Sequence, residues 1–302
     1  MNGSPLVYRA PAKVNLILEV LGKRPDGYHE LALVFQALSL EDELEFRPAE
    51  ADVTVKVEGI PVLPADGTNL VAKAAQVFFE YTRLRGGAAI LLKKRIPLTA
   101  GLGGGSSDAA ATLVALNELY ATNLPAEVLA ELALKLGSDV PFFLVGGTAL
   151  GRGRGEALES LPAVPPLRLA LVKPAEGLST GVVYGSGRIR FTDGSRAREF
   201  GDRMAGATAE DVARGLYNAL EEPAFELQPE CRQIRDELLE AGCLGALVSG
   251  SGSTVFGIAA DETAAGEIAL RLARPGRFTA SASSVPNGIR RIDGSVGRRN
   301  GE

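Results

Sequence analysis

The segment PLTAGLGGGSSDAA, residues 97–110, fixes the interpretation of the fold around it. It follows an apolar run that ends at Pro97, and it leads into an Ala- and Leu-rich helical pattern over 106–120. Glycines allow positive φ angles and let a ligand approach the backbone closely. The N-terminus of the following helix adds unpaired N–H groups and a positive dipole end. The segment therefore predicts a phosphate-binding loop, with a flexible linker or an ordinary glycine turn as the alternative.

This loop differs from the two best-known phosphate motifs. A Walker A motif requires a lysine after its last glycine, and no lysine follows here. The dinucleotide fingerprint GxGxxG fails at Ser106. The hydroxyls of Ser106 and Ser107 can donate to a phosphate, and one of them could reach a phosphate-bound Mg²⁺. We therefore expect a phosphate loop of another kind.

Three other segments carry residues whose chemistry does not suit their surroundings. APAKVNL (10–16) places Lys13 inside an apolar strand, and GSDVPFFL (137–144) places Asp139 beside an apolar run. SGSGST (249–254) forms a glycine-rich turn between two strand patterns, and its N–H groups could bind an anion. The alternatives stay open: a lysine on the solvent face, an aspartate that caps a helix or forms a turn, and a plain glycine hairpin.

The hydrophobic periodicity predicts an α+β fold with two domains. A length of 302 residues suits two domains, and a stretch rich in Gly, Arg and Pro over 152–166 marks the boundary between them. We expect domains over 1–158 and 159–290, followed by a frayed tail over 291–302. Strands are expected over 6–20, 31–40, 52–59, 88–98, 142–151, 167–173, 244–248, 253–259 and 277–285, and helices over 69–84, 106–120, 125–136, 210–221, 229–241 and 262–273.

Composition excludes several classes of function. The chain carries 32 Lys and Arg against 37 Asp and Glu, and this net charge of −5 gives it no general attraction for nucleic acid. No apolar run reaches about 18 residues, and the first residues lack the layout of a signal peptide. The single histidine, His29, excludes a multi-His zinc site, and Cys231 and Cys243 fit no CxxC motif. We expect a cytoplasmic protein with reduced cysteines, no membrane span and a small-molecule substrate.

Taken in order, APAKVNL, PLTAGLGGGSSDAA, GSDVPFFL and SGSGSTVFG resemble the motifs of the GHMP small-molecule kinases. The resemblance implies an N-terminal nucleotide-binding domain and a C-terminal ferredoxin-like domain. It implies ATP as the phosphoryl donor, together with Mg²⁺ whose protein ligands are not assigned. The oligomeric state stays open.

The resemblance also implies roles for individual residues. Asp139 matches the family's catalytic aspartate, which either removes the proton of the acceptor hydroxyl or only orients that hydroxyl. Lys13 matches the catalytic lysine beside it. The ATP phosphates would be held by the loop residues Pro97, Leu98, Thr99, Ala100, Gly101, Leu102, Gly103, Gly104, Gly105, Ser106 and Ser107.

A further motif, RPDGYHEL (24–31), narrows the resemblance to family members whose acceptor is a cytidylyl methylerythritol. Tyr28 and His29 match the residues that receive the cytosine by stacking and hydrogen bonding, and Tyr184 matches a second aromatic residue that closes the site. The implied reaction transfers the γ-phosphoryl group of ATP to the 2-hydroxyl, giving the 2-phosphate and ADP in non-mevalonate isoprenoid precursor synthesis. Two alternatives stay open: another acceptor (mevalonate, homoserine or a sugar), or a catalytically silent nucleotide-binding protein of the same fold.

Overall fold

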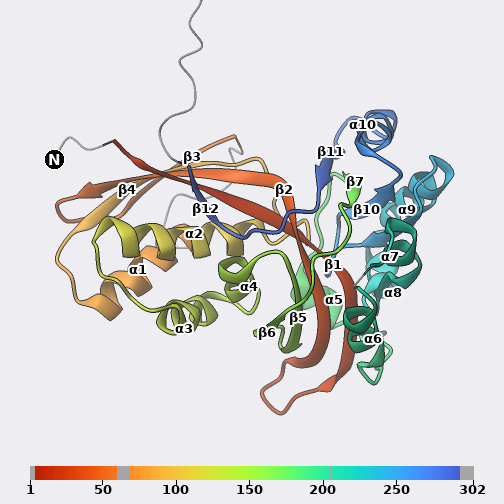
Figure 1. Cartoon of the computed structure of the whole chain (residues 1–302), viewed down its shortest axis with the longest axis horizontal. Helices are drawn as coiled ribbons and strands as arrows, with labels where there is room; N and C mark the ends of the chain where they lie inside the picture. Colours follow the sequence, from red (N-terminus) through yellow and green to blue (C-terminus); the bar gives the residue numbers. More distant parts are fainter. Residues whose placement is uncertain (1–3, 60–68, 205, 293–302) are drawn as a thin grey trace, which may run out of the picture.

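The computed structural model describes residues 4–59, 69–204 and 206–292. Its longest feature is an antiparallel hairpin of β1 (Leu6–Lys23) and β2 (His29–Ala49). The pairing register shifts at three places along this hairpin, and such irregularities bend strands. Figure 1 shows the consequence, because the hairpin runs through the first layered half of the molecule and then turns down beside the second.

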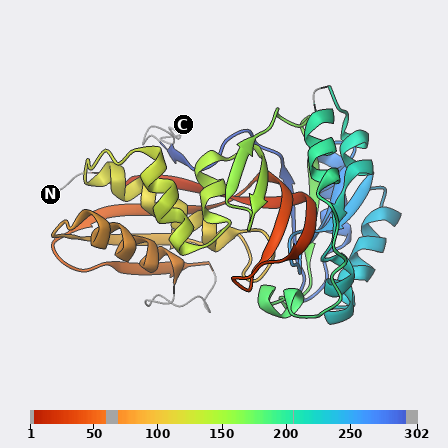
Figure 2. The same cartoon turned by 90° about the horizontal axis from the view of Figure 1, so that it is seen from below.

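The first half consists of a sheet with helices on one face (Figures 1 and 2). The sheet order is β12-β1-β2-β4-β3, and β5 and β6 extend it from β2. The additional strands are β3 (Thr54–Glu58), β4 (Gly87–Lys93), β5 (Thr148–Gly153), β6 (Ala157–Ser160) and β12 (Arg290–Ile292). The helices are α1 (Leu70–Thr82), α2 (Gly104–Leu119), α3 (Ala126–Leu136) and α4 (Val140–Val145).

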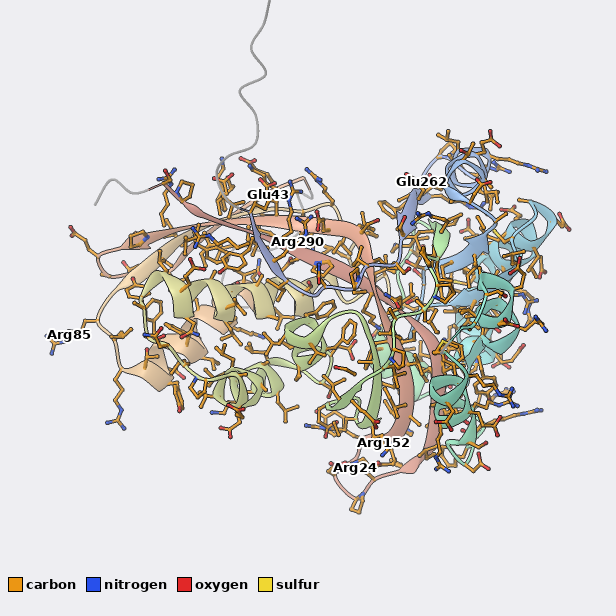
Figure 3. The ribbon with its side chains drawn as sticks, viewed as in Figure 1. Arg24, Glu43, Arg85, Arg152, Glu262 and Arg290 are labelled. Carbon is orange, nitrogen blue, oxygen red and sulfur yellow. The ribbon has the colours of Figure 1, made fainter. Side chains whose placement is uncertain are left out.

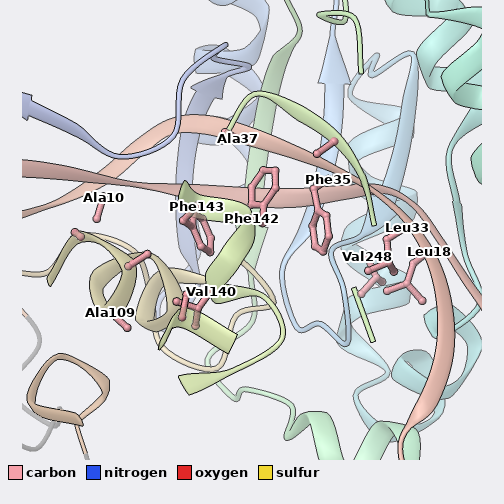
Figure 4. Close-up of a cluster of buried hydrophobic side chains, with 14 of the residues drawn as sticks. Ala10, Leu18, Leu33, Phe35, Ala37, Ala109, Val140, Phe142, Phe143 and Val248 are labelled. Atoms are coloured by element: carbon pink, nitrogen blue, oxygen red, sulfur yellow. The ribbon is translucent and has the colours of Figure 1, made fainter. Parts of the chain in front are cut away.

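Local sequence explains why these helices form and pack closely. Asn69 caps α1, since its Oδ1 accepts the N–H of Val71 at 2.9 Å. The small side chains of α2, such as Ala110, are fully buried and let the helix approach the sheet. Phe35 of β2 stacks on Phe142 of α4 with ring centroids 4.8 Å apart, and Figure 4 shows this contact inside the core. The core therefore joins α4 directly to the long hairpin.

The second half contains the four-stranded antiparallel sheet β11-β7-β10-β9. Its strands are β7 (Arg168–Lys173), β9 (Gly245–Val248), β10 (Val255–Ala259) and β11 (Phe278–Ser283). With α9 (Glu230–Glu240) and α10 (Glu262–Arg271), the chain order is β7-α9-β9-β10-α10-β11, the split βαβ arrangement of a ferredoxin-like unit. This confirms the expected fold class. The remaining elements are α5 (Thr180–Tyr184), α6 (Ser195–Arg203), α7 (Ala209–Gly215), β8 (Tyr217–Asn218) and α8 (Glu221–Leu227).

The strand expected over 142–151 is wrong for its first part. Residues 140–145 form α4, and β5 begins only at Thr148. Pro141 fits the first turn of a helix, where its missing N–H has no partner to lose, and Gly146 ends the helix with φ 71°. A short, continuous apolar run of six residues carries no period that separates a helix from a strand.

The helix expected over 210–221 is also wrong as a single element. It divides into α7 and α8, because Leu216 is extended with ψ 133° and β8 pairs in parallel with β1. The strand expected over 88–98 ends earlier, at Lys93, where the chain turns toward the glycine loop. Both strands of the hairpin are longer than the expected 6–20 and 31–40.

The expected tail over 291–302 begins too early. Arg291 and Ile292 pair with β1 in β12, and Arg291 also forms an ion pair with Glu118. Residues 293–302 lie outside the described part of the chain. Within the described part, no helix has the length and apolar character that crossing a bilayer requires.

Candidate active site

Lys13 lies in β1 at a shift of register and points into the protein. It is 4% exposed, and its Nζ donates to Asn15 Oδ1 at 2.7 Å. The same Nζ lies 3.4 Å from Asp139 Oδ2 and 5.6 Å from the ring centroid of Phe35. A buried ammonium requires such partners, so the solvent-face alternative for Lys13 is wrong.

Asp139 occupies the residue before α4, but its side chain makes no capping hydrogen bond. The carboxylate therefore does not cap the helix that follows, and the capping alternative for Asp139 is wrong. Its side chain is 36% exposed, and its Oδ2 faces the Lys13 ammonium. The pair thus combines a nearly buried cation with a carboxylate that a ligand can reach.

The glycine loop lies directly against this pair. The N–H of Lys13 donates to the carbonyl of Leu102 at 2.9 Å. Gly103 has φ 69°, and a Cβ there would lie 2.7 Å from Phe143 Cζ and 3.0 Å from Lys13 Cγ. Only glycine fits this position. The loop and the start of α2, which hold the predicted phosphate-binding residues from 97 to 107, therefore lie against the Lys13–Asp139 pair.

The SGSGST turn of the second half supports the glycine loop from the other side. Ser249 Oγ donates to the carbonyl of Gly101 at 2.9 Å, and the N–H of Thr254 donates to the carbonyl of Ala100 at 3.1 Å. A Cβ on Gly250 would lie 3.3 Å from Lys13 Nζ. Four segments that are distant in sequence thus meet at Lys13, and SGSGST is more than a plain hairpin.

An aromatic group lies at the far end of the hairpin. The His29 ring lies 5.0 Å from that of Tyr184 and 6.4 Å from that of Phe191. Burial, with a smaller contribution from the charge of Lys23, lowers the pKa of His29, which favours a neutral imidazole able to donate and accept. Tyr28 is 55% exposed and makes no ring contact with Tyr184 in the described part of the chain.

One member of this aromatic group, Tyr184, interacts electrostatically with Asp139. Burial raises the pKa of Tyr184, and the negative charge of Asp139 raises it further. His29, which lies against Tyr184, and the Asp139 carboxylate, whose charge acts on Tyr184, therefore border one region. Sequence reasoning missed Phe191, which has no motif around it and comes near His29 only through the fold.

Comparison with known proteins shows which protein family has this arrangement. Residues 69–147 match the model of the GHMP kinases N terminal domain, and residues 196–277 match that of the GHMP kinases C terminal domain. A protein of Pelotomaculum thermopropionicum named 4-diphosphocytidyl-2-C-methyl-D-erythritol kinase is 51% identical over 88% of this chain and 93% of its own length. The chain belongs to the GHMP kinase family.

Two further relatives of this GHMP kinase carry the same name. The protein of Carboxydothermus hydrogenoformans named 4-diphosphocytidyl-2-C-methyl-D-erythritol kinase is 43% identical over 89% of this chain and 93% of its own. A crystal structure of a 4-(cytidine 5'-diphospho)-2C-methyl-D-erythritol kinase is 37% identical, with a TM-score of 0.75 over 92% of this chain and 99% of that one. The family resemblance and the GHMP fold class are confirmed.

In this GHMP kinase a buried ionic network lies under the glycine loop. Lys94 Nζ contacts Asp42 Oδ2 and lies 2.7 Å from Asp108 Oδ2, and all three side chains are at most 2% exposed. Asp108 lies in α2 just past its first turn, and a Cβ on Gly104 would lie 2.8 Å from Lys94 Nζ. Burial raises the pKa of Asp108 to about 8; Lys94 opposes this shift and Asp42 adds to it.

The same network fixes how the chain enters the loop. Asp42 Oδ1 accepts the N–H groups of Arg95 and Ile96 at 2.6 and 2.9 Å, which is why the strand ends at Lys93. Sequence reasoning missed Lys94 and Asp42. A signal for Lys94 exists, because it continues the alternation of buried positions set by Ile90 and Leu92.

Proposed function

We propose that this small-molecule kinase transfers the γ-phosphoryl group of ATP to the 2-hydroxyl of 4-diphosphocytidyl-2-C-methyl-D-erythritol. Membership of the GHMP kinases makes ATP its co-substrate. The observation that carries the chemistry is the Lys13–Asp139 pair, 3.4 Å apart, against a glycine loop at the start of a helix. The names of relatives up to 51% identical support the choice of acceptor over mevalonate, homoserine or a sugar.

Phosphoryl transfer depends mainly on positioning and on stabilising charge. The loop N–H groups and the positive end of α2 would bind the ATP phosphates. Asp139 would accept the proton of the acceptor hydroxyl or orient that hydroxyl, since its carboxylate is partly exposed and uses no helix cap. Lys13 would stabilise the charge on the transferring group from its buried position.

Mg²⁺ would neutralise the ATP phosphates, and the residues present suit this ion. Mg²⁺ prefers oxygen ligands and keeps several waters, so phosphate oxygens and one or two side chains are enough. Ser107 Oγ at the start of α2 is buried without a hydrogen-bond partner among the described residues, and Asp139 adds a partly exposed carboxylate. We propose Ser107 as the side chain nearest to the ion, while Asp139 faces the acceptor hydroxyl.

The acceptor's cytosine would be bound by Tyr28, His29 and Tyr184. Two of these rings, His29 and Tyr184, already lie 5.0 Å apart, and the exposed ring of Tyr28 offers a surface for stacking. A silent nucleotide-binding protein would need neither a base site nor the Lys13–Asp139 pair. A cytoplasmic location is part of the proposal, since Cys231 and Cys243 are both buried free thiols.

The deciding experiment is a coupled assay of ADP release with ATP and Mg²⁺. The cytidylyl acceptor is compared in parallel with mevalonate and homoserine. Release only with the cytidylyl acceptor is expected. Release with another acceptor would keep the kinase chemistry and refute the cytosine site, while ATP binding without release with any acceptor would favour the silent protein.

A further inference from the structure

The turn between β5 and β6 brings one arginine beside the tip of the hairpin. β5 pairs with β2 so that Gly153 lies opposite Leu31, and the next residue, Arg154, therefore lies beside the start of β2. The turn is tight, because the N–H of Gly155 donates to the carbonyl of Arg152 at 3.0 Å. Figure 3 shows Arg152 and the tip residue Arg24 at the same end of the molecule.

The side chain of Arg154 packs on Tyr28. Its guanidinium carbon lies 4.7 Å from the centroid of the Tyr28 ring, a cation–π distance. Its Nε lies 3.8 Å from Glu156 Oε1, a long ion pair, while Glu156 Oε2 accepts the backbone N–H of Arg154 at 2.5 Å. The main contact of the guanidinium is therefore with the face of the Tyr28 ring.

The backbone under Tyr28 is held by contacts within the turn, to which Arg154 adds only an electrostatic attraction to Asp26. The N–H of Tyr28 donates to Asp26 Oδ1 at 3.1 Å, and Arg24 bridges Asp26 and Glu30 across the turn. The side chain of Tyr28 is nevertheless 55% exposed. Because more than half of this side chain faces solvent, the contact with the Arg154 guanidinium contributes to the orientation of its ring.

We propose that Arg154 is a positioning residue that holds the Tyr28 ring as the stacking surface for the base of the acceptor. This inference rests on the proposed function. A ring that is already oriented loses less conformational freedom when the base binds, so the contact strengthens acceptor binding without touching the reacting atoms. ATP binding and the chemical step at Lys13 and Asp139 are independent of it.

The test uses Arg154→Met, with Arg152→Met as the matched control in the same turn. Arg152 is well exposed, and its Nη2 lies 3.8 Å from Glu159 Oε2. Arg154→Met is expected to raise the acceptor KM about three- to fivefold, with kcat and the ATP KM within about twofold. Arg152→Met is expected to leave all three constants unchanged. Thermal unfolding midpoints equal to wild type establish that each variant is folded.

Two further variants separate positioning from direct contact with the acceptor. In a Tyr28→Ala background, Arg154→Met is expected to have no additional effect on the acceptor KM, because the residue acts through the ring. Arg154→Lys keeps the charge but not the planar guanidinium, so it is expected to raise the acceptor KM less than Arg154→Met does. Additive losses would mean that Arg154 binds the acceptor directly rather than through the ring, and would overturn the inference. Absence of acceptor-dependent ADP release by the wild type would refute the proposed function itself.

Discussion

Lys13 Nζ and Asp139 Oδ2 lie 3.4 Å apart, although one residue belongs to the first strand and the other precedes α4. The two partners differ sharply in environment. The lysine side chain is 5% exposed, whereas that of the aspartate is 36% exposed. A cation held in a dry site exerts a strong field on what lies in front of it. The pair is therefore arranged to act on a ligand that enters from the side of Asp139.

Asp139→Asn tests this arrangement. The amide keeps the shape but can neither accept a proton nor pair with Lys13, so kcat is expected to fall about 10²- to 10⁴-fold or below detection. ATP affinity, measured by calorimetry, is expected to stay within a few-fold. Asp202→Asn, an exposed aspartate of α6, is the control. Equal losses of turnover and ATP binding would show that Asp139 is structural or holds the metal.

Tyr28→Ala tests the proposed cytosine site. Loss of one base–aromatic stack is expected to weaken acceptor binding by about 1–3 kcal/mol, with the ATP KM unchanged. Tyr81→Ala removes a comparably exposed tyrosine from α1 and serves as the control. An acceptor KM equal to that of wild type would remove Tyr28 from the site.

Gly101→Ala tests the contact between the glycine loop and the second half. Gly101 has φ 71°, and a Cβ there would lie 2.0 Å from the carbonyl oxygen of Ser249. The backbone must shift, so ATP affinity is expected to fall at least about tenfold. Gly266→Ala is the control, since its Cβ would meet nothing within 4 Å inside α10, and it is expected to stabilise the protein by about 0.5–1 kcal/mol. Unchanged ATP affinity in Gly101→Ala would contradict the close packing of the loop.

Asp108→Asn tests the buried network through the pH dependence of stability. The pKa of Asp108 rises from an ordinary value of 3.8 to about 8, so the folded state holds this proton more tightly than the unfolded state. Its contribution to the free energy of unfolding is fully present below pH 4 and is lost as the pH rises toward 8. The asparagine does not titrate. Urea unfolding from pH 5 to 8 should therefore show the variant gaining at least about 1 kcal/mol relative to wild type.

A constant difference between the two proteins across this range would mean that Asp108 stays ionised beside Lys94. The comparison cancels the titrating groups outside the buried network, which the two proteins share.

Local signals were sufficient for the elements around the phosphate loop. Asn69 as a cap and the glycine-to-helix transition at Gly104 each depend on neighbours in sequence. The motif order also indicated that Lys13 and Asp139 act together, and the fold brings them into contact. Their chemical roles, like that of Tyr28, stay predictions.

Other features depend on partners that are distant in sequence. The run VPFFLV forms a helix because Phe142 must reach Phe35 of β2. The acidic stretch that lengthens β2 pairs with cations of two neighbouring strands, as Glu43 does with Arg9 and Lys93. No pattern within one segment reveals such pairings. The role of Asp42 was not predicted for the same reason, because its partners lie more than fifty residues away in the sequence.

The strand β1 meets some of its partners only after most of the chain has been made. Ile17 and Leu18 pair with Tyr217 and Asn218, and Val20 accepts the N–H of Thr192. During synthesis this edge of the hairpin emerges first, and its hydrogen-bonding partners are made only about two hundred residues later. An open strand edge can pair with other chains, so newly made protein is exposed to misassembly until its second half arrives. Separating the chain into two independently produced halves would make that exposure permanent.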